Sequence, residues 1–268
     1  MDKIFGFIGT GNMGGALAKA AAKVVPAENM LLSDGYAPVA EALAKELQCK
    51  AVAVNTVAVS ADLIWLGVKP QVMSSMLCSI APYLAARPST FVVVSMAAGL
   101  SIADIRRMAG ADYPVIRIMP NIPVKSGSGV VLYDYTDNVP ADFLEAFRQS
   151  MAYAGLLDRL PEKLIDAGSA LSGCGPAFVS LFVEALADGA VACGLPRAQA
   201  LLYAEQTVMG TAKYLLETET HPAALKDAVC SPGGSTIVGV QALEAGAFRA
   251  SAAEAVVAAF ERTQELGK

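Results

Sequence analysis

Residues 3–15, KIFGFIGTGNMGG, decide the fold, because an apolar run ends there in glycines at the spacing G-x-G-x-x-G. The apolar run is typical of a buried parallel strand, and the alanine-rich sequence after the glycines predicts a helix. In such a unit Gly9 allows a tight turn, Gly11 lets a pyrophosphate approach the backbone, and Gly14 lets helix and strand pack closely. Glycine-rich turns also follow strands for purely structural reasons, but this placement favours a nicotinamide or flavin dinucleotide.

The start of that helix is the expected phosphate site. Its first N–H groups have no partner within the helix and carry a partial positive charge. We therefore expect the loop and the first helical turn to bind the cofactor through Gly9, Thr10, Gly11, Asn12, Met13 and Gly14.

The composition predicts an oligomer. Of 268 residues, 54% are hydrophobic and only 17% are charged, which suggests that much surface is buried between subunits. The length suits two domains. Twenty Lys and Arg against 25 Asp and Glu give a net charge of −5, and without a basic cluster nucleic acid is not an expected partner.

Cysteine and histidine usage excludes several enzyme classes. The five cysteines are scattered and His221 is the single histidine, so neither a zinc site nor a Ser-His-Asp machine is expected. His221, ahead of a predicted helix, fits a turn or cap better than a catalyst. We see no signal-peptide pattern, and the apolar stretch 175–195 contains Glu184 and Asp188. We therefore expect a core or interface helix in a cytoplasmic protein without a membrane span.

Strand and helix patterns alternate up to about residue 158. We expect a doubly wound, mostly parallel α/β sheet, and assign residues 1–160 to a Rossmann-type dinucleotide-binding domain. A helix is expected at 38–48. The expected strands after the first are 30–32, 51–54, 62–68, 91–95, 114–118, 127–132 and 155–157.

The end of the second predicted strand faces the adenosine ribose. Ser33 and Asp34 stand about 20 residues beyond the glycines, where a carboxylate holds the 2′-OH of NAD or polar and basic groups hold the 2′-phosphate of NADP. Asp34 favours NAD and Ser33 suits a phosphate. Gly35 leaves out the arginine that would decide between them.

The ends of the other strands should flank the nicotinamide. Ligands of such sheets lie outside the carboxyl ends of the strands, and Lys69 directly follows one of them. A lysine that is merely solvated at a strand end is the alternative. The expected residues of this half are Asn55, Val68, Lys69, Pro70 and Ala97.

Residues 161–268 should form a second, all-helical domain. Several of its helices are apolar around most of their circumference, so their expected partners are the same helices of a second subunit. The expected helices are 162–172, 176–193, 197–217, 222–230, 236–245 and 247–265.

Several segments together resemble pyrroline-5-carboxylate reductases along nearly the whole chain: GFIGTGNMGG (6–15), AVNTVAVSADLIWLGVKPQ (53–71), RIMPNIP (117–123), ALSGCGPAFV (170–179), GLPRAQALLYAEQTVMG (194–210) and LKDAVCSPGGSTIVGVQALEAGAFRA (225–250). The last segment is the most specific. The sequence SDG at the second strand departs from relatives with a basic residue there. The resemblance implies a helical domain that forms an intertwined homodimer, with larger assemblies left open, and hydride transfer from NADPH, or alternatively NADH, to the C=N bond of 1-pyrroline-5-carboxylate.

This reaction fits the residue inventory, since reducing a cyclic imine needs a hydride donor, a carboxylate pocket and a proton, but no nucleophile or metal. We expect the loop and helix start after residue 230 to bind the substrate carboxylate, although a plain helix cap is the alternative. Thr236 is the catalytic candidate, as an orienting hydrogen-bond partner of the ring nitrogen. The expected substrate residues are Ser231, Gly233, Gly234, Ser235 and Thr236.

Two other functions remain open at this point. A β-hydroxyacid-type 3-hydroxyacid dehydrogenase shares the opening motif, but it places a catalytic lysine in the helix corresponding to 176–193, which has none here. A non-catalytic NAD(P)-binding redox sensor would have a degraded substrate loop, whereas 231–236 is intact.

Overall fold

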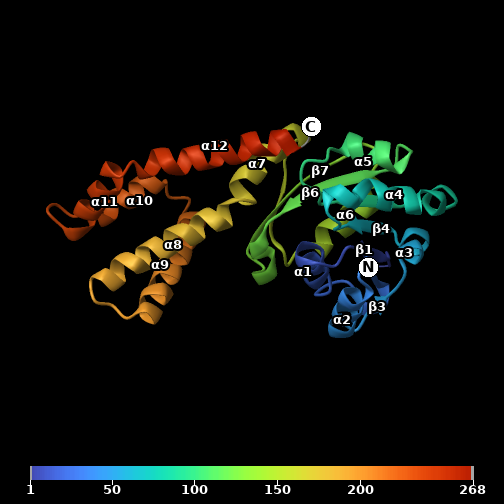
Figure 1. The fold of residues 1–268 in the computed structure, drawn as a ribbon, viewed down its shortest axis with the longest axis horizontal. Helices are drawn as coiled ribbons and strands as arrows, with labels where there is room; N and C mark the ends of the chain where they lie inside the picture. Colours follow the sequence, from blue (N-terminus) through green and yellow to red (C-terminus); the bar gives the residue numbers. More distant parts are fainter. Residues whose placement is uncertain (1, 267–268) are drawn as a thin grey trace. The chain divides into compact units, whose positions relative to one another are not determined.

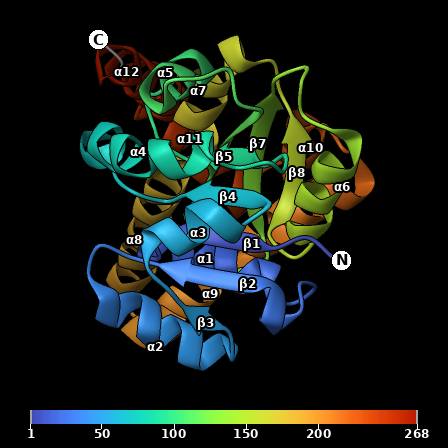
Figure 2. The same ribbon diagram turned by 90° about the vertical axis from the view of Figure 1, so that its right-hand side faces the viewer.

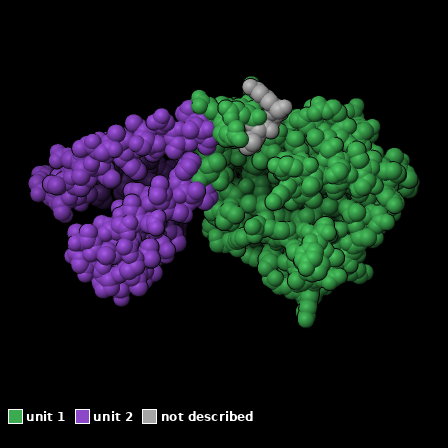
Figure 3. Space-filling model, viewed as in Figure 1, with its two compact units in different colours: residues 1–174, 260–268 green, residues 175–259 purple. Residues whose placement is uncertain are grey.

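The computed structural model describes residues 2–266, which divide into two compact units (Figures 1 and 3). Unit 1 is Met1–Cys174 with Phe260–Lys268, and unit 2 is Gly175–Ala259. The sequence analysis places its boundary at residue 160. The first helix beyond that boundary and the end of the last helix are grouped with the sheet by their contacts.

Unit 1 is built on a sheet that, within the described residues, has eight strands in the order β3-β2-β1-β4-β5-β6-β7-β8 (Figure 2). The first six strands in that order have the arrangement of a doubly wound dinucleotide-binding fold. The strands are β1 Phe5–Ile8, β2 Met30–Ser33, β3 Lys50–Ala51, β4 Leu63–Leu66, β5 Val92–Ser95, β6 Val115–Pro120, β7 Gly129–Tyr135 and β8 Gly155–Arg159.

The sheet is mostly parallel, as expected, but the antiparallel pairing of β7 with β6 was not predicted. β7 pairs antiparallel with β6, with Ile118 opposite Tyr133, and β8 then runs parallel to β7. Between β6 and β7 the chain has only residues 121–128, which include the short 3-10 helix η2 (Ile122–Ser126). A parallel crossover needs a dozen or more residues, so this connection allows only a reversal of direction.

Helices cover both faces of the sheet. One core lies between the sheet and α1, α2 and α6, and the other lies between the sheet and α3, α4 and α5. Trp65 stacks on Phe7 at a centroid distance of 5.1 Å in the first core. The helices of unit 1 are α1 Asn12–Ala21, α2 Ala37–Leu47, α3 Val54–Ser60, α4 Pro70–Ala85, α5 Ile102–Ala109, α6 Ala141–Ser150 and α7 Glu162–Ser172, with the 3-10 turn η1 at Ala27–Asn29.

The predicted strand at 51–54 is also misplaced. The structure has a two-residue edge strand at Lys50–Ala51, and Val54 already begins α3. The valines there suggested a strand because of their β-branched side chains. Packing decides instead, since Val57 and Ala58 are fully buried against the sheet as a helix. Asn55 consequently lies in the first turn of α3 and not in a loop.

A buried arginine joins the sheet to α7. The Arg117 side chain on β6 is 5% exposed and pairs with Asp166 at 2.6 Å and with Glu162 at 3.3 Å. The Glu162 carboxylate also accepts the Ile102 N–H that begins α5. Asp166 in turn accepts a hydrogen bond from Gln264, near the end of α12.

Unit 2 is all helical, as predicted. Its helices are α8 Gly175–Ala192, α9 Arg197–Thr218, α10 Pro222–Val229, α11 Ser235–Ala245 and α12 Phe248–Leu266, whose last turns belong to unit 1. α8 and α9 pack on one another through the small residues Ala187, Ala200 and Ala204. His221 caps α10, with Nδ1 accepting the Ala223 N–H at 3.2 Å, which confirms its prediction as a cap.

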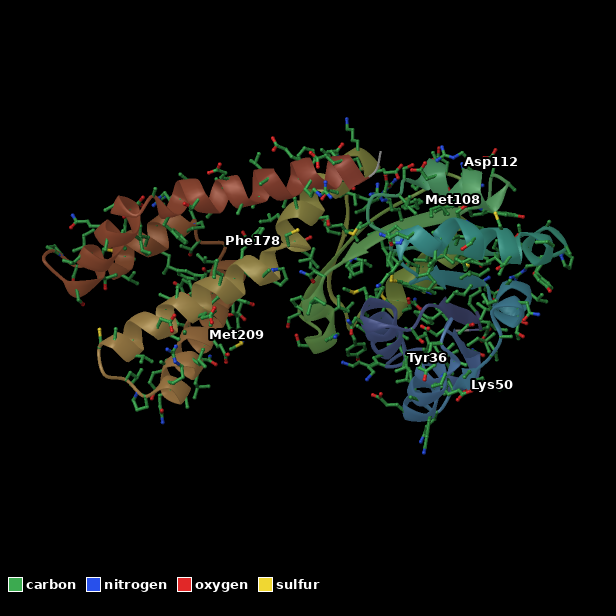
Figure 4. The ribbon with its side chains drawn as sticks, viewed as in Figure 1. Tyr36, Lys50, Met108, Asp112, Phe178 and Met209 are labelled. Atoms are coloured by element: carbon green, nitrogen blue, oxygen red, sulfur yellow. The ribbon has the colours of Figure 1, made fainter. Side chains whose placement is uncertain are left out.

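Large apolar side chains remain on the surface of unit 2. Leu181 is 68% exposed and Leu216 is 81% exposed, and Figure 4 shows Met209 projecting from α9. The segment Glu162–Ala192 is long and apolar enough to cross a membrane by length and composition, and little of it is buried. It also carries the carboxylates that pair with Arg117.

Candidate functional site

The crevice at the carboxyl ends of β1 and β4 is the candidate cofactor site. At this point the strand order reverses, so loops from the two strands diverge and leave room for a ligand. Gly9 ends β1 with a φ of +89°, and its N–H donates to the Ser33 carbonyl at 2.8 Å. Gly67 ends β4, and its N–H donates to the Ile8 carbonyl at 2.7 Å.

The glycines here have different physical roles. A Cβ atom added to Gly14 or to Gly67 would overlap the carbonyl oxygen of Gly9, so both positions are needed for close backbone packing. A Cβ atom on Gly11 would meet no heavy atom within 4 Å. Gly11 therefore leaves open space beside the loop, whereas Gly9, Gly14 and Gly67 hold the loop together. Gly67 was not predicted, although a glycine directly after a buried strand was the available signal.

The start of α1 is free to bind an anion. Gly11 is the N-cap and provides no side-chain hydrogen bond to the first turn, and both Gly11 and Asn12 are exposed. The first N–H groups of an α-helix have no partner within the helix, and the space beside Gly11 is open. These residues fit the pyrophosphate of a dinucleotide.

Asp34 braces the loop from the end of β2. Its Oδ2 accepts the Thr10 N–H at 2.7 Å, and its Oδ1 accepts the Tyr36 N–H at 3.0 Å. Thr10 and Ser33 are almost fully buried around it. The carboxylate thus links the glycine loop to the start of α2, a contact between distant residues that the sequence alone did not reveal.

A cleft of about 780 Å³ opens beside Asp34. It runs from the end of β1 to the first turns of α3 and α4, and Val68 lines it together with Ser33. Its apolar walls and its place next to the Asp34 carboxylate suit a flat apolar group such as an adenine base. Its lining residues are Ile8, Ser33, Asp34, Gly35, Ala37, Ala40, Glu41, Ala51, Val52, Ala53, Val54, Val68, Val72, Ser75, Met76 and Ser79.

Of the residues predicted for the nicotinamide half, Lys69 and Ala97 follow the neighbouring strands β4 and β5, Asn55 lies on α3, and Val68 lines the cleft beside Asp34 instead. Lys69 is the exposed N-cap of α4, and Pro70 is the first residue of that helix. Asn55 is exposed on α3, where its Oδ1 accepts the Thr56 N–H at 2.9 Å. The Ala97 side chain is 2% exposed and packs in the core under α4 and α5, while the adjacent Ala98 is exposed.

The predicted substrate loop lies in unit 2. Gly233 has a φ of +68°, and the Gly234 N–H donates to the Ser231 carbonyl at 3.0 Å, which closes a turn before α11. Gly234 is the N-cap without a side-chain hydrogen bond, and Ser235 and Thr236 are exposed in the first turn. The start of α11 therefore resembles the start of α1, with a glycine cap and free N–H groups.

The structure therefore groups the cofactor candidates in unit 1 and the substrate candidates in unit 2. Within residues 2–266, no three His, Cys, Asp or Glu side chains gather in a way that would hold a metal ion. The exposed hydroxyl of Thr236 is consistent with a hydrogen-bonding role and not with a nucleophile activated by a base, because the single histidine caps α10.

Two family models match the chain. Residues 162–266 match the family described as pyrroline-5-carboxylate reductase dimerisation, and residues 4–99 match the family described as NADP oxidoreductase coenzyme F420-dependent. The first covers the helices with exposed apolar side chains. The second covers the glycine loop, Asp34 and Lys69.

Relatives match over the full length. The chain is 41% identical to a pyrroline-5-carboxylate reductase of Synechocystis sp., over 98% of both chains, and 40% identical to that of Escherichia coli over 100% of both. Among solved structures, a Plasmodium falciparum pyrroline carboxylate reductase with NADP bound has a TM-score of 0.88 at 31% identity, covering 100% of this chain and 99% of that one. A pyrroline-5-carboxylate reductase from Coxiella burnetii gives 0.91 at 29% identity, with complete coverage of both.

Proposed function

Because the chain belongs to the pyrroline-5-carboxylate reductase family, we propose that it reduces the C=N bond of 1-pyrroline-5-carboxylate to L-proline, the last step of proline biosynthesis. NADPH is the hydride donor, with NADH as a second possible donor. The observation that carries the proposal is similarity over the whole length, through both the glycine loop and the loop before α11. The open space at Gly11 beside an uncapped helix fits the dinucleotide independently.

When bound, the reduced nicotinamide supplies the hydride. The first turn of α1 binds the pyrophosphate, and Asp34 lies at the adenosine ribose. Asn55, Lys69 and Pro70 flank the nicotinamide half from the ends of neighbouring elements. The exposed ammonium of Lys69 adds a positive charge beside an anionic cofactor.

The start of α11 binds the substrate carboxylate. Its free N–H groups and the helix dipole favour an anion there, and Gly233 and Gly234 keep the backbone uncovered. The Thr236 hydroxyl hydrogen-bonds the ring nitrogen and orients it. A hydroxyl is too weakly acidic to supply most of the rate as a proton donor, so the imine enters protonated or takes its proton through water.

The helical unit forms a homodimer. The family model for dimerisation and the exposed leucines of α8 and α9 support this assignment. The apolar segment Glu162–Ala192 then faces a second subunit and not a lipid bilayer, in a cytoplasmic enzyme that binds no nucleic acid. Dimers stacking into larger assemblies are compatible with the apolar surface. We place the functional boundary between residues 160 and 161, just before the dimerisation family match that begins at residue 162.

The direct test is turnover. Protein, NADPH and 1-pyrroline-5-carboxylate are mixed, and the absorbance of the reduced cofactor is followed, with NADH in a parallel assay. Proline formation is measured in the same samples. No substrate-dependent loss of either cofactor would refute the proposal.

Thr236→Ala tests the substrate loop. We expect kcat to fall about 10-fold to 100-fold, the effect of losing a hydrogen bond worth roughly 1.5–3 kcal/mol in the transition state. Ser251→Ala, an exposed hydroxyl on α12, is the control and should leave kcat unchanged. Wild-type kcat and KM in Thr236→Ala would remove this residue from the site.

The alternatives are less well supported. Neither of the relatives cited above is a β-hydroxyacid dehydrogenase, and α8 has no lysine to act as the catalytic residue of that class. A redox sensor without activity is distinguished by the same turnover assay.

A further inference from the structure

We propose that Asn121 is a positioning residue for the reduction: its side chain fixes the end of α7, from which the chain continues into unit 2. This role rests on the proposed function and deepens it. It also accounts for two segments of the family resemblance, 117–123 and 170–179, that include none of the cofactor or substrate candidates.

The Asn121 amide holds two backbone groups at once. Asn121 directly follows β6 and is 7% exposed. Its Nδ2 donates to the carbonyl of Ser172, the last residue of α7, at 2.9 Å, and its Oδ1 accepts the Val130 N–H of β7 at 2.9 Å. The last carbonyls of a helix have no partner within it, so this bond satisfies a group that α7 itself leaves open. A primary amide offers both a donor and an acceptor, whereas a carboxylate of the same shape lacks the donor.

Alternate residues of β6 hold α7 along its length. Arg117, Met119 and Asn121 stand two residues apart in extended backbone, so their side chains lie on the same face. Arg117 pairs with two carboxylates in the first turns of α7, and Met119 packs with the fully buried Ile165 between them. These two residues secure the first half of the helix, and Asn121 secures its end.

The end of α7 is thereby held at the cofactor edge of the sheet. β6 runs parallel to β5, so its carboxyl end lies at the same edge as the ends of β1 and β4, where the glycine loop and Lys69 stand. The chain leaves unit 1 at Cys174, two residues beyond the carbonyl that Asn121 holds. The last residues of unit 1 are therefore fixed to the sheet that carries the cofactor candidates.

This attachment matters because the proposed reaction joins groups from both units, the nicotinamide bound by unit 1 and the substrate carboxylate bound by unit 2. The reacting atoms must approach to about 3–3.5 Å, and a misplacement of about 1 Å can lower the rate about 100-fold. Both amide atoms of Asn121 are engaged by backbone groups, so the residue acts through α7 and not by contact with a ligand. Loss of its bond to Ser172 should slow hydride transfer and leave NADPH binding unchanged.

Asn121→Ala and Asn121→Asp test this role against a matched control. Alanine removes both hydrogen bonds, whereas aspartate keeps an oxygen for the Val130 N–H and loses the donor to Ser172. Asn138→Ala is the control, because the exposed Asn138 amide likewise donates to a backbone carbonyl, that of Asp112, but holds no part of α7. NADPH-loaded enzyme is mixed with excess 1-pyrroline-5-carboxylate, and the absorbance of the reduced cofactor gives the rate of a single turnover.

We expect the single-turnover rate to fall about 10-fold to 100-fold in both Asn121 variants. The dissociation constant for NADPH, measured by calorimetry, should stay within about twofold of wild type. Asn138→Ala should keep the wild-type rate even where denaturant unfolding shows a similar loss of stability.

Wild-type rates in both Asn121 variants would overturn the positioning role while the reductase function stands. A loss of NADPH affinity that matches the loss of rate would also overturn it, because Asn121 would then contact the cofactor. If Asn121→Ala does not fold, Asn121→Asp decides, and failure of both to fold would overturn the positioning role in favour of a purely structural one.

Hydrogen exchange separates this role from the proposed function, because it needs no turnover. The N–H groups of Gly173 and Cys174 donate to the Ser169 carbonyl at 2.7 Å and 3.3 Å, in the turn that follows α7. In Asn121→Ala these amides should exchange about 3-fold to 10-fold faster, the change expected for losing one hydrogen bond, and Asn138→Ala should leave them unchanged. Unchanged exchange in Asn121→Ala would overturn the role. Faster exchange, in a protein whose wild type does not oxidise NADPH with 1-pyrroline-5-carboxylate, would refute the proposed function and support the attachment of α7 by Asn121.

Discussion

The two units differ in where their apolar side chains lie. In unit 1, aromatic and aliphatic residues such as Trp65, Phe147 and Leu77 are fully buried in two cores against the sheet. In unit 2, the buried apolar residues are the alanines between α8 and α9, and leucines such as Leu181 and Leu216 remain exposed. One unit is complete within a single chain. The other has the side chains of a core without the second layer that would cover them.

From this difference we expect unit 2 to depend on association with a second chain. Burying a leucine side chain stabilises by about 1.5–3 kcal/mol, so covering several of them offsets the entropy cost of pairing two chains. The same helices exposed in a monomer would form a surface prone to aggregation. Stability of unit 2 should therefore depend on protein concentration, while stability of the sheet unit should not.

The largest expected effect comes from placing a charge on an exposed leucine of unit 2, with a matched leucine of unit 1 as the control. Leu181→Asp on α8 should abolish dimers and activity, because the carboxylate would be buried without a partner. Leu156→Asp on the edge strand β8 changes a side chain of similar exposure, 61% against 68%, and should leave the dimer intact. Sedimentation at micromolar concentration measures both. A dimeric, active Leu181→Asp protein would contradict the expectation that the exposed leucines of unit 2 are buried between two chains.

The second prediction tests the close packing of the sheet unit. Gly14→Ala should lower the free energy of unfolding by about 1–3 kcal/mol or more, because its Cβ overlaps the Gly9 carbonyl. Gly11→Ala should change it by less than about 1 kcal/mol, since the added methyl enters open space.

For NADPH affinity we expect the larger effect at Gly11, the position where stability changes least. Gly11→Ala is expected to bind NADPH at least about 10-fold more weakly while remaining folded, because the methyl occupies the space for the pyrophosphate. Denaturant unfolding and calorimetry on both variants give the two quantities. Unchanged NADPH affinity in Gly11→Ala would contradict the assignment of the glycine loop.

The last prediction compares one ion pair from each unit, and its exposed pair has the smallest expected effect. Arg117→Met leaves Glu162 and Asp166 without their partner and should cost about 2–4 kcal/mol, somewhat below a fully buried pair because both carboxylates keep some exposure. Arg197→Met breaks an exposed pair with Asp188 on α8 and should cost less than about 1 kcal/mol. Equal losses of unfolding free energy would show that burial in unit 1 is not what strengthens its pair.

Local patterns predicted most of the fold. The glycine spacing placed β1 and α1, and the helices of unit 2 begin and end within a few residues of expectation, because Pro196, Pro222 and the glycines before α11 mark their starts. The prediction failed where distant contacts decide. Direction of β7 depends on the length of a connection, and the valines of α3 became helical because of what they pack against.

The site residues that the sequence could predict are those whose place follows from the end of a strand or from a specific motif. Strand ends identified Asp34 and Lys69 as candidates, and the loop before α11 was found by its resemblance. The hydrogen bond from Thr10 to Asp34 joins residues far apart in the chain, and the one from Tyr36 depends on how the backbone turns after β2. Neither can be predicted from the spacing of residues. Glu41 was missed because a single acidic residue on a helix gives no signal of the cleft it lines.

The return of α12 to unit 1 has a consequence for how the protein is made. The helix passes from unit 2 back to the sheet unit, where Gln264 donates to Asp166 on α7 at 3.2 Å. On a ribosome, the sheet emerges early, but the helical segment that completes unit 1 is translated only after the whole of unit 2. The first unit therefore waits for the second to be synthesised, and a nascent chain that stalls just before residue 260 would contain all of unit 2 but lack the segment that completes unit 1.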